Sequence, residues 1–218
     1  MRSPRPRGRS APLPSDLMRI VDDYRHHYHS NVLAEQEWFG DAALPLEWSI
    51  RRAALSRVPF GRDGRELIHG HQRRIGKERL ATAAATLARH VASLQGTQNF
   101  DALLRVVETA IRPITGIGEL AIYDISHRIG MRLGYAPTHV HLHAGTRDGA
   151  RALGFSGREG MLPLAAFDRT LQVLTAAEIE DLLCIYKKEL LLLAAGKPLP
   201  GHIGSAGCRA RQSRGVCG

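Results

Sequence analysis

The segment from residue 111 to residue 134 contains the residue types and spacing in this chain that best suit binding chemistry. Its first part, Pro113–Gly118, reads PITGIG. The proline cannot continue a helix, and the two glycines can adopt dihedral angles barred to other residues. Free amide groups in such a turn, at the start of a following helix, favour an anion such as phosphate. The sequence therefore predicts a phosphate-binding turn, with a purely structural turn between two helices as the alternative.

Basic side chains near this turn extend the predicted phosphate contacts. The contacts predicted within the segment come from Thr115, Gly116, Ile117, Gly118, Arg112, Arg128 and Arg132. A second basic segment, residues 65–79, adds Arg73, Arg74 and Lys77. No aromatic residue is interleaved there for base stacking, and a solvated helix start would have the same composition. Glu119 suits the dipole of the second helix but would repel a phosphate.

Three histidines, His139, His141 and His143, alternate in the string THVHLHAGT. On a strand they would share one face and could hold zinc or iron, whereas on a helix only the first and third lie one turn apart. Because the surroundings are helical, we expect the helical geometry. The candidate metal ligands are then His139 and His143, and the alternative is that these histidines bind no metal. His69 and His71 are further candidates that the sequence cannot place nearby.

The hairpin supports a resemblance to known proteins. Pro113–Gly118 resembles the turn of helix-hairpin-helix DNA-binding proteins, which grip a phosphate backbone without reading bases. The string Pro137–Val140 stands where the endonuclease III-like DNA glycosylase superfamily has a string that begins with its catalytic aspartate. Here that position is Pro137, Leu120 stands at the position of the Schiff-base lysine, and the four-cysteine iron–sulfur loop is absent. The resemblance thus implies DNA binding without glycosylase chemistry.

A second resemblance carries no activity. The chain is similar to a group of uncharacterised bacterial proteins with the pattern GIGELxxYDxxxRIG…LHAGT, here at residues 116–130 and 142–146. We therefore expect a protein that binds nucleic acid without reading its sequence and is not an enzyme. The alternatives are an enzyme that processes nucleic acid or uses a metal at His139 and His143 with an acid such as Asp124 or Asp148, and a helical protein-interaction module.

Helices must position these residues. Apolar side chains recur at steps of three or four, which predicts helices from residue 15 and over residues 46–58, 76–94, 99–112, 119–133 and 175–196. Asn99 is the expected cap of one helix, and Thr175 and Glu178 form the capping box of another. No two alternating segments look paired, so strands are few or absent. The predicted fold class is an all-α, multi-helix domain that contains a helix-hairpin-helix element.

Composition and charge narrow the cellular setting. Hydrophobic residues make up 44% of the 218, which is enough for a core, and no apolar run approaches the ~20 residues of a membrane span. We therefore expect a cytoplasmic protein. Of the net charge of +9, seven arginines lie near the two ends, so these ends attract nucleic acid or are plain solvated extensions. The predicted parts are a disordered basic tail at 1–14, helical parts at 15–98 and 99–196, and a flexible basic tail at 197–218.

Overall fold

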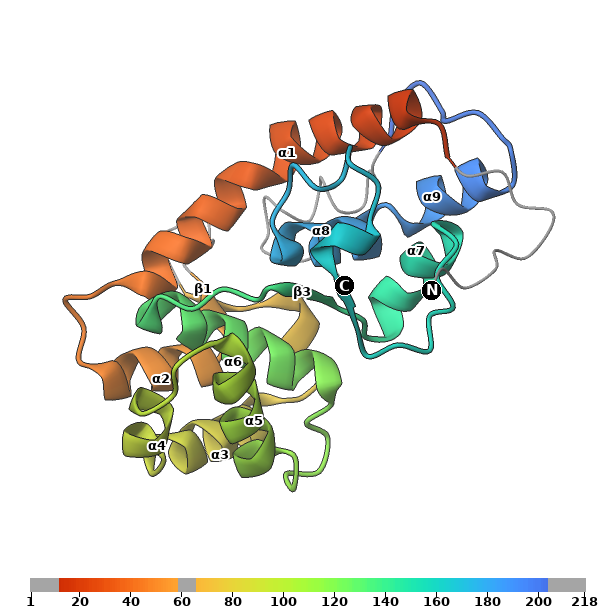
Figure 1. The fold of residues 1–218 in the computed structure, drawn as a ribbon. Coiled ribbons are helices and arrows are strands. Elements are labelled where there is room, and N and C mark those ends of the chain that lie inside the picture. The colour runs from red at the N-terminus through yellow and green to blue at the C-terminus, as the bar shows by residue number, and fades with distance from the viewer. Residues whose placement is uncertain (1–11, 59–65, 204–218) are drawn as a thin grey trace. The chain divides into compact units, whose positions relative to one another are not determined.

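The computed structural model describes residues 12–58 and 66–203 and is mostly helical (Figure 1). The α-helices in these ranges are α1 (Pro14–Gly40), α2 (Leu46–Ala54), α3 (Lys77–Ala88), α4 (Val91–Gln95), α5 (Phe100–Ile111), α6 (Glu119–Leu133), α7 (Ala144–Ala152), α8 (Ala176–Ile185) and α9 (Lys187–Ala194). Two short 3₁₀ helices lie at Gly70–Gln72 and Leu164–Ala166. The strands are β1 (Arg57–Val58), β2 (Leu67–Ile68), β3 (His139–His141) and β4 (Met161–Pro163), and they form two antiparallel pairs, β1–β2 and β3–β4. The predicted helical class is confirmed, with two very small sheets added.

The described chain divides into two compact units. Unit 1 comprises residues 12–29 and 138–203, and unit 2 comprises residues 30–58 and 66–137. These boundaries differ from the sequence-based division at residue 98, because residues beyond 138 pack on the first part of α1. Most of each predicted tail falls on residues 1–11 and 204–218, which lie outside the described ranges.

Unit 2 is built around the apolar faces of its helices. Helix α5 packs on α6 and α3, and α2 packs on α3 and α6. The side chains that form this core, each less than a tenth exposed, are Phe39, Ile50, Ala53, Ala54, Val58, Ala83, Ala84, Leu87, Leu94, Leu103, Val107, Ile111, Ile117, Ala121, Ile122, Ile125 and Ile129. Helices α5 and α6 are therefore held by apolar burial, the largest favourable contribution to folding.

Unit 1 joins the start of the chain to its last helices. The Tyr186 hydroxyl donates to Asp23 Oδ2 at 2.6 Å, and the Tyr24 hydroxyl donates to Asp181 Oδ2 at 3.2 Å. Helix α7 packs on both α8 and α9. The two tyrosine hydrogen bonds each join residues more than 150 positions apart, so local sequence patterns do not reveal this unit.

The predicted helix caps are confirmed. Asn99 Oδ1 accepts a hydrogen bond from the amide of Ala102 at 2.9 Å. Thr175 and Glu178 bond to each other's backbone amides, as a capping box requires. Both features depend on residues at most three positions apart, and such local hydrogen bonds satisfy amides that a helix start leaves free.

Four elements differ from expectation. The helix predicted at 46–58 ends at Ala54, because residues 57–58 pair with β2 as strand β1. The helix predicted at 76–94 is interrupted at Arg89 and His90, and the one at 175–196 is interrupted at Tyr186, whose hydroxyl bonds to α1. The expected helical geometry at 139–143 is wrong, because residues 139–141 form strand β3 through pairing with β4. Within the described ranges, no helix is both long and apolar enough to cross a membrane.

Helix α7 approaches α8 so closely that only glycine fits at position 149. A Cβ atom at Gly149 would lie 2.4 Å from the carbonyl oxygen of Leu183. Alanine is normally the better helix former by about 1 kcal/mol, but here the backbone clash outweighs that gain. We predict that Gly149→Ala lowers the free energy of unfolding by about 1–3 kcal/mol, measured by urea denaturation.

Gly160 provides the matched control. A Cβ atom there meets nothing within 4 Å. Gly160→Ala should therefore change the free energy of unfolding by less than about 1 kcal/mol. Equal effects of the two substitutions would contradict the close approach of α7 to α8.

Candidate functional site

The turn between α5 and α6 contains the residues predicted to bind phosphate. After α5 the amides of Ile114 and Ile117 each donate to the carbonyl three residues earlier, at 3.0 Å. Gly116 has a φ angle of +92°, in the left-handed region that favours glycine. Gly118 is extended and serves as the N-cap of α6. The chain thus reverses tightly and places the start of α6 directly after the two glycines.

Within the turn, the side chain of Ile117 is buried and the residues on either side of it are exposed. Ile117 is only 7% exposed and belongs to the core of unit 2. Gly116 and Gly118 are both exposed. Neither of their amides donates a hydrogen bond to any group in the described part of the chain. Two amide donors at a helix start therefore stand free for a ligand.

A basic side chain from α3 lies against this turn. A Cβ atom at Gly116 would lie 3.1–3.5 Å from the Cδ, Nε and Cζ atoms of Arg79. Arg79 is exposed, and its Nη1 also donates to the carbonyl of Ile75 at 3.0 Å. The sequence placed Arg79 in the basic segment but gave no reason to bring it to the turn. The packing of α3 on α5 supplies that reason.

The other predicted basic residues of this segment are also accessible. Arg73, Arg74 and Lys77 are exposed at and just before the start of α3. They form no ion pair within the described ranges. The acidic residue Glu78 lies between Lys77 and Arg79 in the sequence. Together with Arg79 they provide four positive charges within seven residues, which we call the α3 basic segment (Arg73–Arg79).

The remaining predicted residues of the turn are used in different ways. Thr115 is exposed. Arg112 is half-exposed and pairs with Glu108 one helical turn earlier. Arg132 is partly buried and donates to backbone carbonyls, including that of Leu44 at 3.1 Å. Arg128 is only 4% exposed, so its guanidinium is not presented to solvent.

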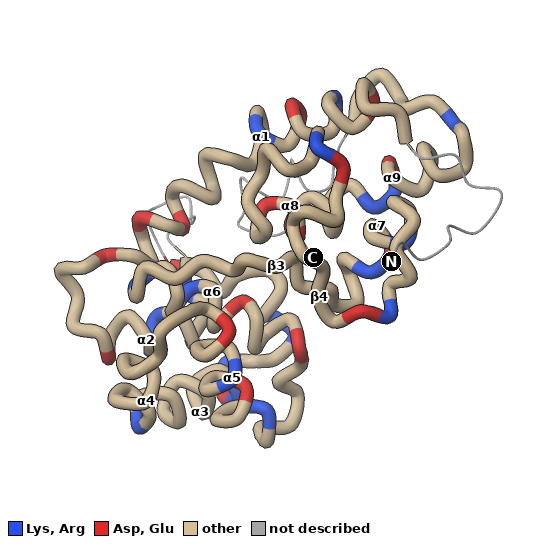
Figure 2. The backbone as a smooth tube through the Cα atoms, viewed as in Figure 1, with Lys and Arg blue, Asp and Glu red and all other residues tan. Residues whose placement is uncertain are grey.

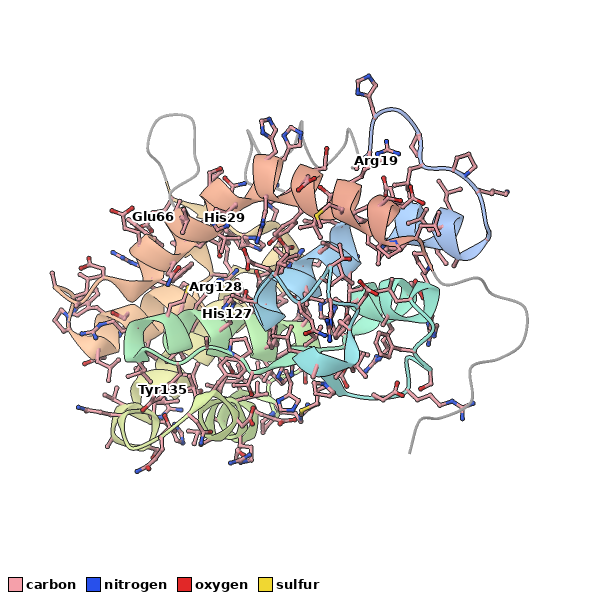
Figure 3. The ribbon with its side chains drawn as sticks, turned by 45° about the horizontal axis from the view of Figure 1, so that its top comes forward. Arg19, His29, Glu66, His127, Arg128 and Tyr135 are labelled. Carbon is pink, nitrogen blue, oxygen red and sulfur yellow. The ribbon has the colours of Figure 1, made fainter. Side chains whose placement is uncertain are left out.

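Arg128 instead belongs to a polar cluster inside unit 2; its side chain is labelled in Figure 3. Its Nη1 donates to Ser56 Oγ at 3.0 Å, and its guanidinium carbon lies 5.3 Å from the centre of the Phe39 ring. Ser56 is the one non-glycine residue with a positive φ angle, +53°, in the described ranges. The Ser56 carbonyl also accepts the amide of His69 at 2.8 Å. Ser56 thus keeps an unfavourable backbone conformation at a position where its hydroxyl accepts from Arg128 and its carbonyl accepts from His69.

Two histidines and two acids complete this cluster. His71 Nδ1 lies 3.5 Å from Asp124 Oδ2, and His69 Nε2 lies 3.7 Å from Glu35 Oε1. The two imidazole rings meet edge to face, with centres 4.9 Å apart. The fully buried Gln72 donates from Nε2 to Asp124. We call the set Glu35, His69, His71, Gln72, Asp124 and Arg128 the histidine–aspartate cluster.

Burial and charge shift the protonation of this cluster. Burial, together with the positive charges of Arg128 and His71, lowers the pKa of His69 to about 3. Burial raises the pKa of Glu35. The pKa of Asp124 is held below its usual range, because the hydrogen bond from His71 and the charge of Arg128 outweigh its burial. Burial therefore dominates at Glu35, whereas at Asp124 the hydrogen bond from His71 and the charge of Arg128 prevail.

The histidines predicted as metal ligands lie elsewhere. His139 is on strand β3, where its Nδ1 is 3.0 Å from Thr138 Oγ1. His143 is buried and caps α7, with Nδ1 accepting from the amide of Gly145 and Nε2 bonded to Glu180. Neither joins two further metal-binding side chains in the described ranges. His69, His71 and Asp124 were each noted as candidates from the sequence. Because Asp124 is more than 50 positions from the two histidines, no local pattern indicates that the three lie together.

Comparison with known proteins adds no family assignment. No protein-family model, no curated protein and no solved structure matches the chain at a significant level. The resemblance to helix-hairpin-helix proteins therefore stays a prediction, and the function is inferred from the geometry of unit 2.

The buried position of Arg128 leads to a stability prediction. Arg128→Met leaves Glu35 and Asp124 without their guanidinium, and removing one partner of a buried charge set typically costs about 3–5 kcal/mol. We expect a fall of that size in the free energy of unfolding, measured by urea denaturation followed by circular dichroism.

Arg112 is the matched control on the surface. Its pair with Glu108 is exposed, so Arg112→Met should cost less than about 1 kcal/mol. If Arg128→Met proved as mild as Arg112→Met, the guanidinium of Arg128 would not hold the cluster together.

Proposed function

We propose that this protein binds nucleic acid without reading its sequence, through the phosphate backbone at the turn between α5 and α6. The observation that carries the proposal is the pair of exposed, unbonded amides of Gly116 and Gly118 beside the Arg79 guanidinium. Two amide donors and a guanidinium suit the oxygens of one phosphate, since charged hydrogen bonds of this kind are the stronger ones. The dipole of α6, a helix of 15 residues, adds to the attraction.

The α3 basic segment extends this surface along the backbone of the ligand. Arg73, Arg74 and Lys77 supply further charges for neighbouring phosphates, and Thr115 supplies a hydroxyl on the turn itself. Phosphate contacts position a protein on nucleic acid but carry no sequence information. Since no aromatic residue interleaves with the basic segment, base stacking has no platform there. The proposed binding is therefore indifferent to sequence.

The charge pattern supports a local contact rather than a wide basic face. Figure 2 shows acidic and basic residues interspersed along the described chain. Residues 15–204 have 23 basic and 21 acidic side chains, so most of the excess positive charge lies in the terminal arginines. A test of the turn must therefore remove the contribution of the ends. A background with glutamine in place of all seven arginines does this: Arg2, Arg5, Arg7, Arg9, Arg209, Arg211 and Arg214.

In that background, Arg79→Gln should weaken binding to a short DNA duplex. One fewer phosphate contact reduces the slope of log affinity against log salt by about 0.9. Fluorescence anisotropy at several salt concentrations measures this slope. Arg89→Gln is the control, because Arg89 is exposed at the other end of α3, about 15 Å away along the helix.

Two results would contradict the proposal. In the first, the tail-neutralised chain (the chain with all seven terminal arginines replaced by glutamine) shows no salt-dependent affinity, so the ends are the sole source of binding. In the second, Arg79→Gln and Arg89→Gln change the slope equally, so the turn has no special role.

Gly116 provides an independent arm of the same experiment. In Gly116→Ala, a Cβ atom would press on Arg79 and strain the turn at its positive φ angle. Gly134→Ala imposes a similar strain at φ +76° but meets nothing within 4 Å. We expect both variants to lose stability and only Gly116→Ala to lose DNA affinity. A loss of affinity in both variants would point to general destabilisation instead.

A further inference from the structure

The histidine–aspartate cluster brings together donor atoms that a metal ion requires. His69, His71 and Asp124 each offer one ligand atom, and these atoms all lie within 4.8 Å of one another. Atoms bound to one tetrahedral zinc ion at about 2.0–2.2 Å lie about 3.3–3.6 Å apart. His71 Nδ1 and Asp124 Oδ2 are already 3.5 Å apart. The remaining pairs must close by up to about 1.5 Å for the three side chains to share one ion.

The residue types select the kind of ion. Two imidazoles with one carboxylate form the ligand set of several catalytic zinc sites and of non-haem iron sites, and both kinds leave coordination positions open. Calcium and magnesium prefer oxygen ligands only, which disfavours them here. A divalent transition metal is the ion that this set suits best.

The surroundings hold the donors in place. Gln72, fully buried, donates to Asp124, and hydrogen bonds of this kind orient metal ligands in known sites. The backbone amide of His69 is fixed by the carbonyl of Ser56 at 2.8 Å. Nδ1 of His69 and Oε1 of Gln72 are buried and have no partner at full hydrogen-bond geometry within the described ranges, although the Gln72 side chain interacts with the His69 imidazole. Unsatisfied buried polar atoms are costly, and a metal ion or its water ligand would satisfy them.

The charges of the cluster leave room for a cation. Glu35 and Asp124 face the single guanidinium of Arg128, which is directed to Ser56 Oγ and the Phe39 ring. With both acids ionised and both imidazoles neutral, as metal binding requires, one negative charge exceeds the single positive charge of Arg128. Glu35, 3.7 Å from His69, is the nearest further carboxylate.

We propose that His69, His71 and Asp124 bind one divalent transition-metal ion, with Glu35 as the next carboxylate beside it. The site is separate from the phosphate-binding turn and shares no residue with it. The two proposals can therefore fail independently of each other.

Titration of the full chain, first treated with a chelator, tests this site. Zn²⁺ binding is measured by calorimetry, and Co²⁺ binding by its visible absorption, which reports the coordination geometry of the ion. We expect one ion per chain. His71→Gln and Asp124→Asn should each weaken binding by more than about 100-fold. Loss of a residue that only hydrogen-bonds to a metal ligand costs about 10–100-fold, so a larger loss indicates direct ligation. Bound Zn²⁺ should also raise the unfolding temperature by about 5–10 °C at a hundredfold excess over Kd.

His139→Gln is the control and should leave affinity unchanged, since His139 lies on strand β3 outside the cluster. Circular dichroism separates misfolding from loss of a ligand, and Asp124→Asn keeps the shape of the side chain if His71→Gln fails to fold. The proposal is overturned if the chain shows no saturable binding. It is equally overturned if binding survives both substitutions, as binding by Cys208 and Cys217 would.

Discussion

The packing of Ile117 into the core of unit 2 is the constraint on which the proposed binding surface depends. Its side chain lies among the apolar faces of the surrounding helices, so the backbone on either side must turn outward. Only glycine tolerates the φ angle of +92° that follows at position 116. Ile117 thus anchors the turn in the core, while the glycines on either side of it remain exposed. The geometry that we propose for phosphate binding therefore depends on apolar packing rather than on any polar side chain in the turn.

Helix α6 connects this outward-facing surface to a polar interior. Its first residues follow the glycine turn, and its later residues include Asp124 and Arg128, which face the histidine–aspartate cluster. Burying this many charged groups is unfavourable unless each is paired. Arg128 donates to Ser56 and acts electrostatically on Asp124 and Glu35, and Asp124 interacts with Gln72 and His71. The same helix therefore presents its start to solvent and places ionisable side chains inside.

Local features of this fold were predictable from sequence and distant ones were not. The caps at Asn99 and Thr175 depend on residues three positions away, and the structure confirms both. Arg128 carries no local sign of burial, because its environment comes from Ser56, 72 positions earlier. Strand β3 likewise owes its form to pairing with β4, about 20 residues later, which overrides the helical surroundings. His69 and Asp124 were individually noticeable, but only the packing of the Gly70–Gln72 turn on α6 unites them.

The most direct test is nitrogen-15 NMR of the labelled, tail-neutralised chain during titration with a short DNA duplex at low salt. If the outward amides bind phosphate, the signals of Gly116 and Gly118 shift among the most strongly, together with that of Arg79. Shifts that spare both glycines while other residues respond would show that nucleic acid, if bound at all, is held elsewhere.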